Sequence, residues 1–90
     1  MTLKIERISG KRRARIRLSG ELRYDQLDQV KAEIERVRAV ALDLGELDLV
    51  DIEAVRFLNA CVAEGVSVVH CSRYIREWML REQVLKRTHP

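Results

Sequence analysis

The apolar residues of this chain follow two different spacings, and the change from one to the other predicts the secondary structure. Residues 3–8 and 14–18 are short β-type runs joined by a charged, turn-forming segment, which is typical of a hairpin of two strands. In residues 24–37 the apolar side chains recur every three or four positions, the period of an amphipathic helix. The chain is therefore predicted to begin with two strands and a helix.

The rest of the chain alternates between strand and helix patterns. Residues 40–44 read Val-Ala-Leu-Asp-Leu, a nearly continuous apolar run that predicts a buried parallel strand. Helical spacing returns over residues 51–64, where Asp51 is placed to cap the first turn. A second buried strand is expected at residues 66–70, and Ser72 can then cap a third helix.

This order of elements sets the fold class. Strands that alternate with helices after an initial hairpin give the order β-β-α-β-α-β-α. We therefore expect an α/β protein, with a small mixed four-stranded sheet and three helices packed on it. A chain of 90 residues has room for one core, so residues 1–90 are expected to form a single domain.

Composition excludes disordered and membrane-spanning proteins. Hydrophobic residues make up 47% of the chain and charged residues 34%, which is too apolar for disorder and too interrupted by charge for a membrane span. Residues 1–7 lack the apolar core of a secretory signal. We therefore expect a cytoplasmic protein in which Cys61 and Cys71 stay reduced.

The net charge of +3 includes a basic stripe near the N-terminus. Arg13, Arg15 and Arg17 share one face of the second predicted strand, and Lys11 and Arg12 precede them. Such a stripe can bind nucleic acid or an acidic partner, or it can be a solvated face that prevents edge-to-edge strand pairing. No aromatic residue is interleaved to stack on bases, which favours the solvated face and argues against nucleic acid as a partner.

The sequence patterns that carry enzymatic chemistry are missing. His70 and His89 are the two histidines, and neither shows a metal-binding spacing. The glycines are isolated, which excludes a phosphate-binding loop. His70 and Cys71 would point to opposite faces of a strand, which argues against a cysteine nucleophile with a histidine base. We expect no catalytic residue, no metal and no cofactor.

Acidic residues gather where the third predicted strand ends. They are Asp43, Glu46, Asp48, Asp51 and Glu53. Ligands of open α/β sheets bind at the carboxyl ends of the strands, so a binding site is expected here. Asp51 is accounted for as a helix cap. Glu46, Asp48 and Glu53 have no expected role in the hydrophobic core.

Three segments carry a resemblance to a known family. They are the strand that ends Leu-Ser-Gly-Glu-Leu at residues 18–22, the Leu-Asp-Leu strand at residues 42–44, and the Asp51 that opens the next helix. In this order and spacing they resemble the STAS domain, which bacterial anti-sigma factor antagonists share with the cytoplasmic tails of sulfate transporters. The resemblance covers roughly residues 14–82.

The resemblance implies a non-enzymatic module of signal transduction and transcription regulation. It would bind a protein of the anti-sigma factor or serine kinase type, or a larger signalling assembly. In the antagonists the helix begins Asp-Ser-Ser-Gly, and phosphorylation of its first serine switches binding off. This chain has Asp51 but continues with Ile52, Glu53 and Ala54. Because Ile52 has no hydroxyl group, the switch of the family cannot operate there.

Two interpretations of this departure are open. Glu53 can supply a permanent negative charge near the helix N-terminus and mimic part of the phosphorylated state. Alternatively, Ile52 can add an apolar contact to a constitutive docking surface, and we favour this second interpretation. The expected partner-binding residues are Glu46, Asp48, Asp51, Ile52, Glu53 and Arg56.

A small-molecule sensor on the same fold is the alternative function. Some STAS domains bind nucleotides or lipids. Here Arg56, Arg73 and Arg76 could hold an anion at the edge of the sheet.

The resemblance also predicts uncovered apolar surface at the C-terminal end. The family commonly continues past the third helix with another strand and helix, for which residues 83–90 are too few. The missing elements would expose apolar side chains, with Trp78, Met79 and Leu85 as candidates. We therefore expect a homodimer or a stable complex with a partner.

Overall fold

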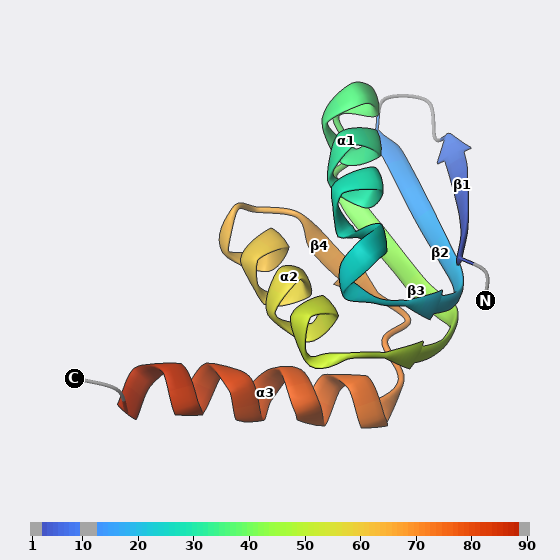
Figure 1. Cartoon of the computed structure of the whole chain (residues 1–90). Coiled ribbons are helices and arrows are strands. Elements are labelled where there is room, and N and C mark those ends of the chain that lie inside the picture. Colours follow the sequence, from blue (N-terminus) through green and yellow to red (C-terminus); the bar gives the residue numbers. More distant parts are fainter. Residues whose placement is uncertain (1–2, 10–12, 89–90) are drawn as a thin grey trace.

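Eight elements of secondary structure follow one another in the computed structural model, which describes residues 3–9 and 13–88. The predicted order of strands and helices is confirmed, with one additional turn of 3₁₀ helix, η1 (Figure 1). The elements are β1 (Leu3–Ser9), β2 (Ala14–Leu22), η1 (Tyr24–Gln26), α1 (Leu27–Val37), β3 (Ala41–Val50), α2 (Ile52–Ala63), β4 (Ser67–Val69) and α3 (Arg73–Thr88).

The four strands form one mixed sheet in the order β1-β2-β3-β4. The hairpin strands β1 and β2 are antiparallel, whereas β2, β3 and β4 run parallel to one another. Helix α1 connects β2 to β3 and helix α2 connects β3 to β4, and right-handed connections in the same direction place both helices on one face of the sheet. The opposite face, which we call the open face, points away from α1 and α2 (Figure 1).

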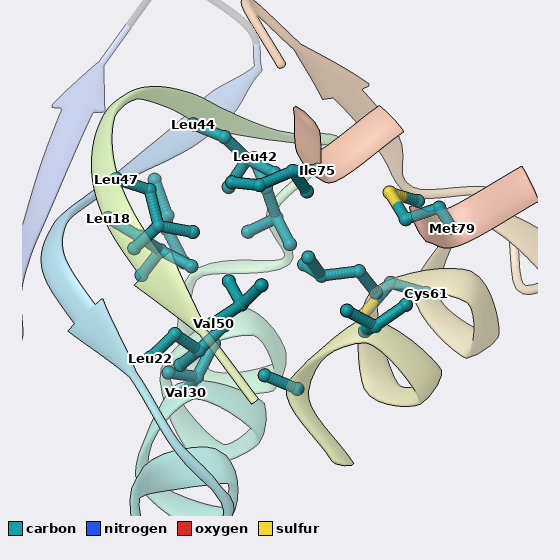
Figure 2. Close-up of a cluster of buried hydrophobic side chains, with 14 of the residues drawn as sticks. Leu18, Leu22, Val30, Leu42, Leu44, Leu47, Val50, Cys61, Ile75 and Met79 are labelled. Carbon is teal, nitrogen blue, oxygen red and sulfur yellow. The ribbon is translucent and has the colours of Figure 1, made fainter. Parts of the chain in front are cut away.

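Alternate side chains of the central strands build the core against these helices. Ile16 and Leu18 of β2, with Leu42 and Leu44 of β3, are at most 1% exposed. Figure 2 shows that strand and helix side chains form one continuous cluster. The helices contribute the fully buried residues Val30, Val55, Leu58 and Ile75.

Strand β3 is longer than the sequence predicts. The apolar run stops at Leu44, but the strand continues through Gly45 to Val50 because its second half pairs with β2, with Val50 opposite Leu22. In this second half Leu47 and Val50 are buried. Strand β4 is shorter than predicted, since it ends before His70, which has a left-handed φ of 56°.

Helix α3 packs along α2 and extends beyond it. Ser72 begins the helix as predicted, because its hydroxyl oxygen accepts a hydrogen bond from the Ile75 amide at 3.2 Å. Met79 is 7% exposed and lies in the core, so the expected exposed patch is wrong at that residue; Trp78 is half-buried and Leu85 is exposed. No helix in the described part of the chain has the length and apolar character needed to cross a membrane.

The core position of α2 leads to a first prediction. Leu58→Ala should lower the free energy of unfolding by about 2–5 kcal/mol, since it leaves a cavity beneath the sheet. Val62→Ala, on the same helix at a side chain that is 44% exposed, should change it by about 0.5 kcal/mol or less. Urea denaturation followed by circular dichroism measures both, and equal losses would contradict the assigned orientation of α2.

Candidate functional site

One carboxylate, that of Asp51, holds the N-termini of two helices. Its Oδ1 accepts a hydrogen bond from the Ala54 amide at 2.8 Å, which caps α2 as predicted. Its Oδ2 accepts a second hydrogen bond from the Tyr24 amide at 2.8 Å, where η1 begins. The Asp51 amide donates to the Leu22 carbonyl at 3.3 Å. Asp51 therefore fixes how the chain leaves both β2 and β3.

The parallel pairing of β2 and β3 explains this meeting point. Parallel strands end at the same edge of a sheet, so the segments that follow them begin side by side. Tyr24 follows β2 and Ile52 follows β3, and both flank Asp51. This is the edge at which open α/β sheets bind their ligands.

Exposed apolar residues lie close to Asp51, either next to it along the chain or across its hydrogen bond to the Tyr24 amide. Tyr24 is 69% exposed, Leu49 38% and Ile52 40%. We call these three residues, together with the exposed Asp48 and Glu53, the cap surface. The hydrophobic spacing grouped Tyr24 with the apolar side of the first helix, and it placed Leu49 in no predicted strand or helix. The sequence signal for the exposure of Tyr24 was its position in the first turn of the predicted helix. Side chains in that turn lie at the end of the helix and need not contact the sheet.

The other two predicted partner-binding residues, Glu46 and Arg56, do not belong to the cap surface, although Arg56 contacts its edge through Glu53. Glu46 is exposed but lies farther back along β3, opposite Ser19, on the order of 15 Å of strand from Asp51. Arg56 donates from Nε to Glu82 at 3.1 Å and from Nη1 to Glu53 at 3.4 Å. Because Glu82 belongs to α3, Arg56 attaches α3 to α2.

The ion pairs of Arg56 help to choose between the two interpretations of the helix start, Glu53 as a phosphate mimic or Ile52 as an apolar contact. Glu53 already has a cationic partner in Arg56, so its charge is partly neutralised within the chain. This pairing weighs against Glu53 as a mimic of a phosphoryl group and favours the interpretation in which Ile52 is an apolar contact. Arg73 is likewise paired, with Glu77 at 3.2 Å. Two of the three arginines considered for an anion site therefore already face carboxylates.

A second cluster lies on the open face of the sheet, around Asp43. Among the charged residues of 3–8 and 13–85, whose burial the structure describes, Asp43 is the one that is buried. Its Oδ1 accepts a hydrogen bond from the Gly45 amide at 2.9 Å. Its Oδ2 lies 3.2 Å from Nδ1 of His70 and 3.6 Å from a terminal nitrogen of Arg17. Three segments, β2, β3 and the turn after β4, are thereby joined.

The cluster fits closely around Gly45. A Cβ atom at this position would lie 3.2 Å from Oδ1 of Asp43 and 3.3 Å from Cβ of His70. Burial raises the pKa of the Asp43 carboxyl, but the hydrogen bonds from Gly45 and His70 and the charge of Arg17 outweigh it. The net pKa is lower than the ordinary value, so Asp43 is ionised at neutral pH. A lone Asp in an apolar strand was the sequence signal for this cluster.

The basic stripe is only partly described. Arg15 is exposed and Arg17 is half-exposed, and both alternate with the buried Ile16 along β2 as predicted. Arg17 faces Asp43, so part of its charge is used within the chain. Lys11 and Arg12 lie outside the described residues.

The cysteines are not activated for chemistry. Both are free thiols. Burial, aided by the charge of Glu64, raises the pKa of Cys61 to about 11. Burial also raises the pKa of Cys71, against the opposing charge of Arg76. The described residues contain no group of three or more His, Cys, Asp or Glu side chains that could hold a metal ion.

The arrangement of the sheet and helices is shared with solved proteins. The anti-sigma factor antagonist SpoIIAA, in its unphosphorylated form, superposes with a TM-score of 0.61 over 96% of this chain and 96% of its own, at 17% sequence identity. This chain has the SpoIIAA-like fold. The predicted resemblance to STAS domains is thus confirmed for the fold.

A second solved structure also has the SpoIIAA-like fold. It is an uncharacterized protein of the DUF3478 family from Shewanella loihica PV-4, with a TM-score of 0.54 and 16% identity over 93% of this chain and 79% of that chain. Neither a family model nor a curated protein matches the sequence. Because the SpoIIAA alignment spans 96% of that protein, it gives no support to the expectation that this chain lacks a further strand and helix.

The double cap at Asp51 gives a second prediction. Asp51→Ala removes both acceptors and should lower the free energy of unfolding by about 1–3 kcal/mol. Asp51→Asn keeps one oxygen for Ala54 but cannot accept from Tyr24 with its amide nitrogen, so its loss should be smaller. Urea denaturation of the three proteins at pH 7 would contradict this role if the alanine variant were as stable as the parent.

The lowered pKa of Asp43 gives a third prediction, with a defined sign. A carboxyl whose pKa is lower in the folded than in the unfolded state stabilises the protein above the unfolded pKa of about 4. That contribution disappears as the pH falls through the folded pKa. Asp43→Asn should therefore destabilise the protein by about 1–3 kcal/mol at pH 7 and by progressively less at lower pH.

Urea denaturation at pH 7, 5 and 3 measures this difference between parent and variant. Taking the difference cancels the contributions of the other carboxyl groups, which titrate in both proteins. A stability difference that stays constant or grows as the pH falls would contradict the ionised state assigned to Asp43.

Proposed function

We propose that this protein is a non-enzymatic regulatory module that binds another protein through the cap surface. The observation that carries the proposal is the set of exposed apolar side chains around the double cap, Tyr24, Leu49 and Ile52. The SpoIIAA-like fold supports it, because an anti-sigma factor antagonist is one solved protein with this fold. The protein would act in the cytoplasm of a bacterium, in a pathway that regulates transcription.

The composition of the cap surface suits a protein interface. Interface centres are poor in charge and rich in aromatic side chains, with polar residues at the rim. Tyr24 and Ile52 would form such a centre, with Asp48 and Glu53 beside them. The hydrogen bonds of Asp51 hold the backbone at this centre before a partner arrives. Little ordering of the backbone would then oppose binding.

The charge of this region indicates the chemistry of the partner. Asp48 is acidic and exposed, and Glu53 adds a charge that Arg56 partly neutralises, although the chain as a whole carries a net charge of +3. A basic partner surface would be attracted to the acidic rim and oriented by it. We propose a protein of the anti-sigma factor or serine kinase type, bound without a phosphorylation switch because Ile52 cannot accept a phosphoryl group.

Ile52→Asp tests the proposal in a calorimetric titration. The purified protein would be titrated with each anti-sigma factor and serine kinase encoded in the same genome. At least one should bind, and Ile52→Asp should raise its Kd by about tenfold or more by placing a charge at the apolar centre. Val62→Asp is the matched control, because Val62 is 44% exposed on the same helix but lies away from Asp51.

Two results would contradict the proposed function. One is that none of these proteins binds the parent chain. The other is a partner that binds both variants as tightly as the parent, which would place the interface elsewhere. Circular dichroism of each variant establishes that a loss of binding does not reflect loss of the fold.

A further inference from the structure

Helix α3 exposes more large apolar side chains than any other element in the described part of the chain. Eight large apolar side chains are exposed in the described part of the chain. Four of them belong to α3: Tyr74, Leu80, Val84 and Leu85. The inner face of α3 is occupied, since Ile75 and Met79 lie in the core. In Figure 1 the C-terminal half of α3 extends past the other elements. The outer surface of α3 is thus a second candidate interface, separate from the cap surface.

One flank of α3 has the spacing of a helix-pairing seam. Tyr74, Trp78, Arg81 and Leu85 follow one another at steps of four, three and four residues, as the contact positions of paired helices do. The rings of Tyr74 and Trp78 are already in contact, with centroids 5.9 Å apart. We call these four residues the α3 seam. It runs along about 16 Å of the helix.

The α3 seam is complementary to itself when a second copy runs antiparallel. Read backwards it has the same steps, so Tyr74 would meet the second copy's Leu85, and Trp78 would meet the second copy's Arg81. An arginine over the face of a tryptophan is a favourable cation–π contact. Antiparallel helices also set opposite ends of their dipoles side by side. A parallel pair would instead place the two Arg81 side chains against each other.

The charges on α3 are compatible with this pairing. Its two acidic residues already have partners, Glu77 with Arg73 and Glu82 with Arg56. Arg81 is exposed and has no ion pair with any described residue, so its guanidinium is available to an aromatic face. On this helix Leu80 and Val84 lie on a different side from the seam, and the charged Glu77 lies between that side and the seam. A membrane surface would require one continuous apolar face, which α3 lacks.

We propose that two copies of this chain associate through antiparallel packing of their α3 seams. The dimer would be two-fold symmetric, with each copy offering the same four side chains. Its formation does not depend on the cap surface or on the partner proposed for it.

Sedimentation velocity of the whole chain tests the dimer, at concentrations from about 1 to 100 µM. The parent protein should sediment as a dimer in the upper part of this range. Tyr74→Glu should raise the dimer dissociation constant by about tenfold or more, because it puts a charge in the seam. Leu80→Glu is the matched control, since Leu80 is 53% exposed and Tyr74 52% on the same helix. It should leave the constant unchanged.

Arg81→Glu provides a second seam variant at an exposed position, and circular dichroism establishes that each variant is folded. It should also weaken the dimer, since it removes the cation from the face of Trp78. A parent protein that stays monomeric at every concentration overturns the proposal. So does a folded Tyr74→Glu or Arg81→Glu protein that dimerises as the parent does, or a Leu80→Glu protein that dissociates equally.

The antiparallel direction has its own test by disulfide trapping. In a Cys71→Ser background, Tyr74→Cys protein mixed with Leu85→Cys protein should form a mixed disulfide under mild oxidation. Tyr74→Cys protein alone should form little, because the two positions lie far apart in an antiparallel pair. A dominant disulfide between two Tyr74→Cys chains would overturn the antiparallel arrangement.

Discussion

The architecture depends on the carboxylate of Asp51, which accepts hydrogen bonds from the first turns of both η1 and α2. A helix begins with amide groups that lack partners inside the helix, and here one side chain supplies acceptors for two such ends. The two segments can share it only because β2 and β3 are parallel neighbours whose ends meet at one edge. The same geometry brings Tyr24 and Ile52 into the cap surface. Capping and the proposed binding centre are therefore two consequences of one contact.

A second polar anchor, Asp43, stabilises the sheet from the open face. Its carboxylate is buried although no helix of the α1–α2 layer covers it, because Arg17 and the turn at His70 close around it. A buried charge is tolerated only where hydrogen bonds and opposite charges replace the lost water. The contact with Asp43 also holds His70 in place. The left-handed backbone of His70 directs the chain from β4 into α3. Gly45 leaves the space in which these groups meet.

The position of α3 follows from contacts with α2 rather than with the sheet alone. Asn59 donates a hydrogen bond to the Met79 carbonyl at 3.0 Å and accepts one from Gln83 at 2.8 Å, beside the ion pair of Arg56 and Glu82. These polar contacts fix which side of α3 faces inward. They leave Tyr74, Arg81 and Leu85 of the α3 seam exposed and Trp78 half-buried beside them, so the proposed partner surface and the proposed dimer surface occupy different parts of the molecule.

The order of the elements and the cap at Asp51 could be predicted from the amino-acid sequence, because hydrophobic spacing and helix-capping chemistry are local properties of the chain. The sequence also shows that Ile52 cannot be phosphorylated, because its side chain has no hydroxyl group. Three other features emerged from the folded arrangement: β3 continues past Gly45, Tyr24 is exposed, and Arg56 pairs with Glu82. The same arrangement also placed Asp43, Arg17 and His70 together. The physical reason is that these features depend on contacts between segments far apart in the chain, which the pairing of strands and the docking of α3 create.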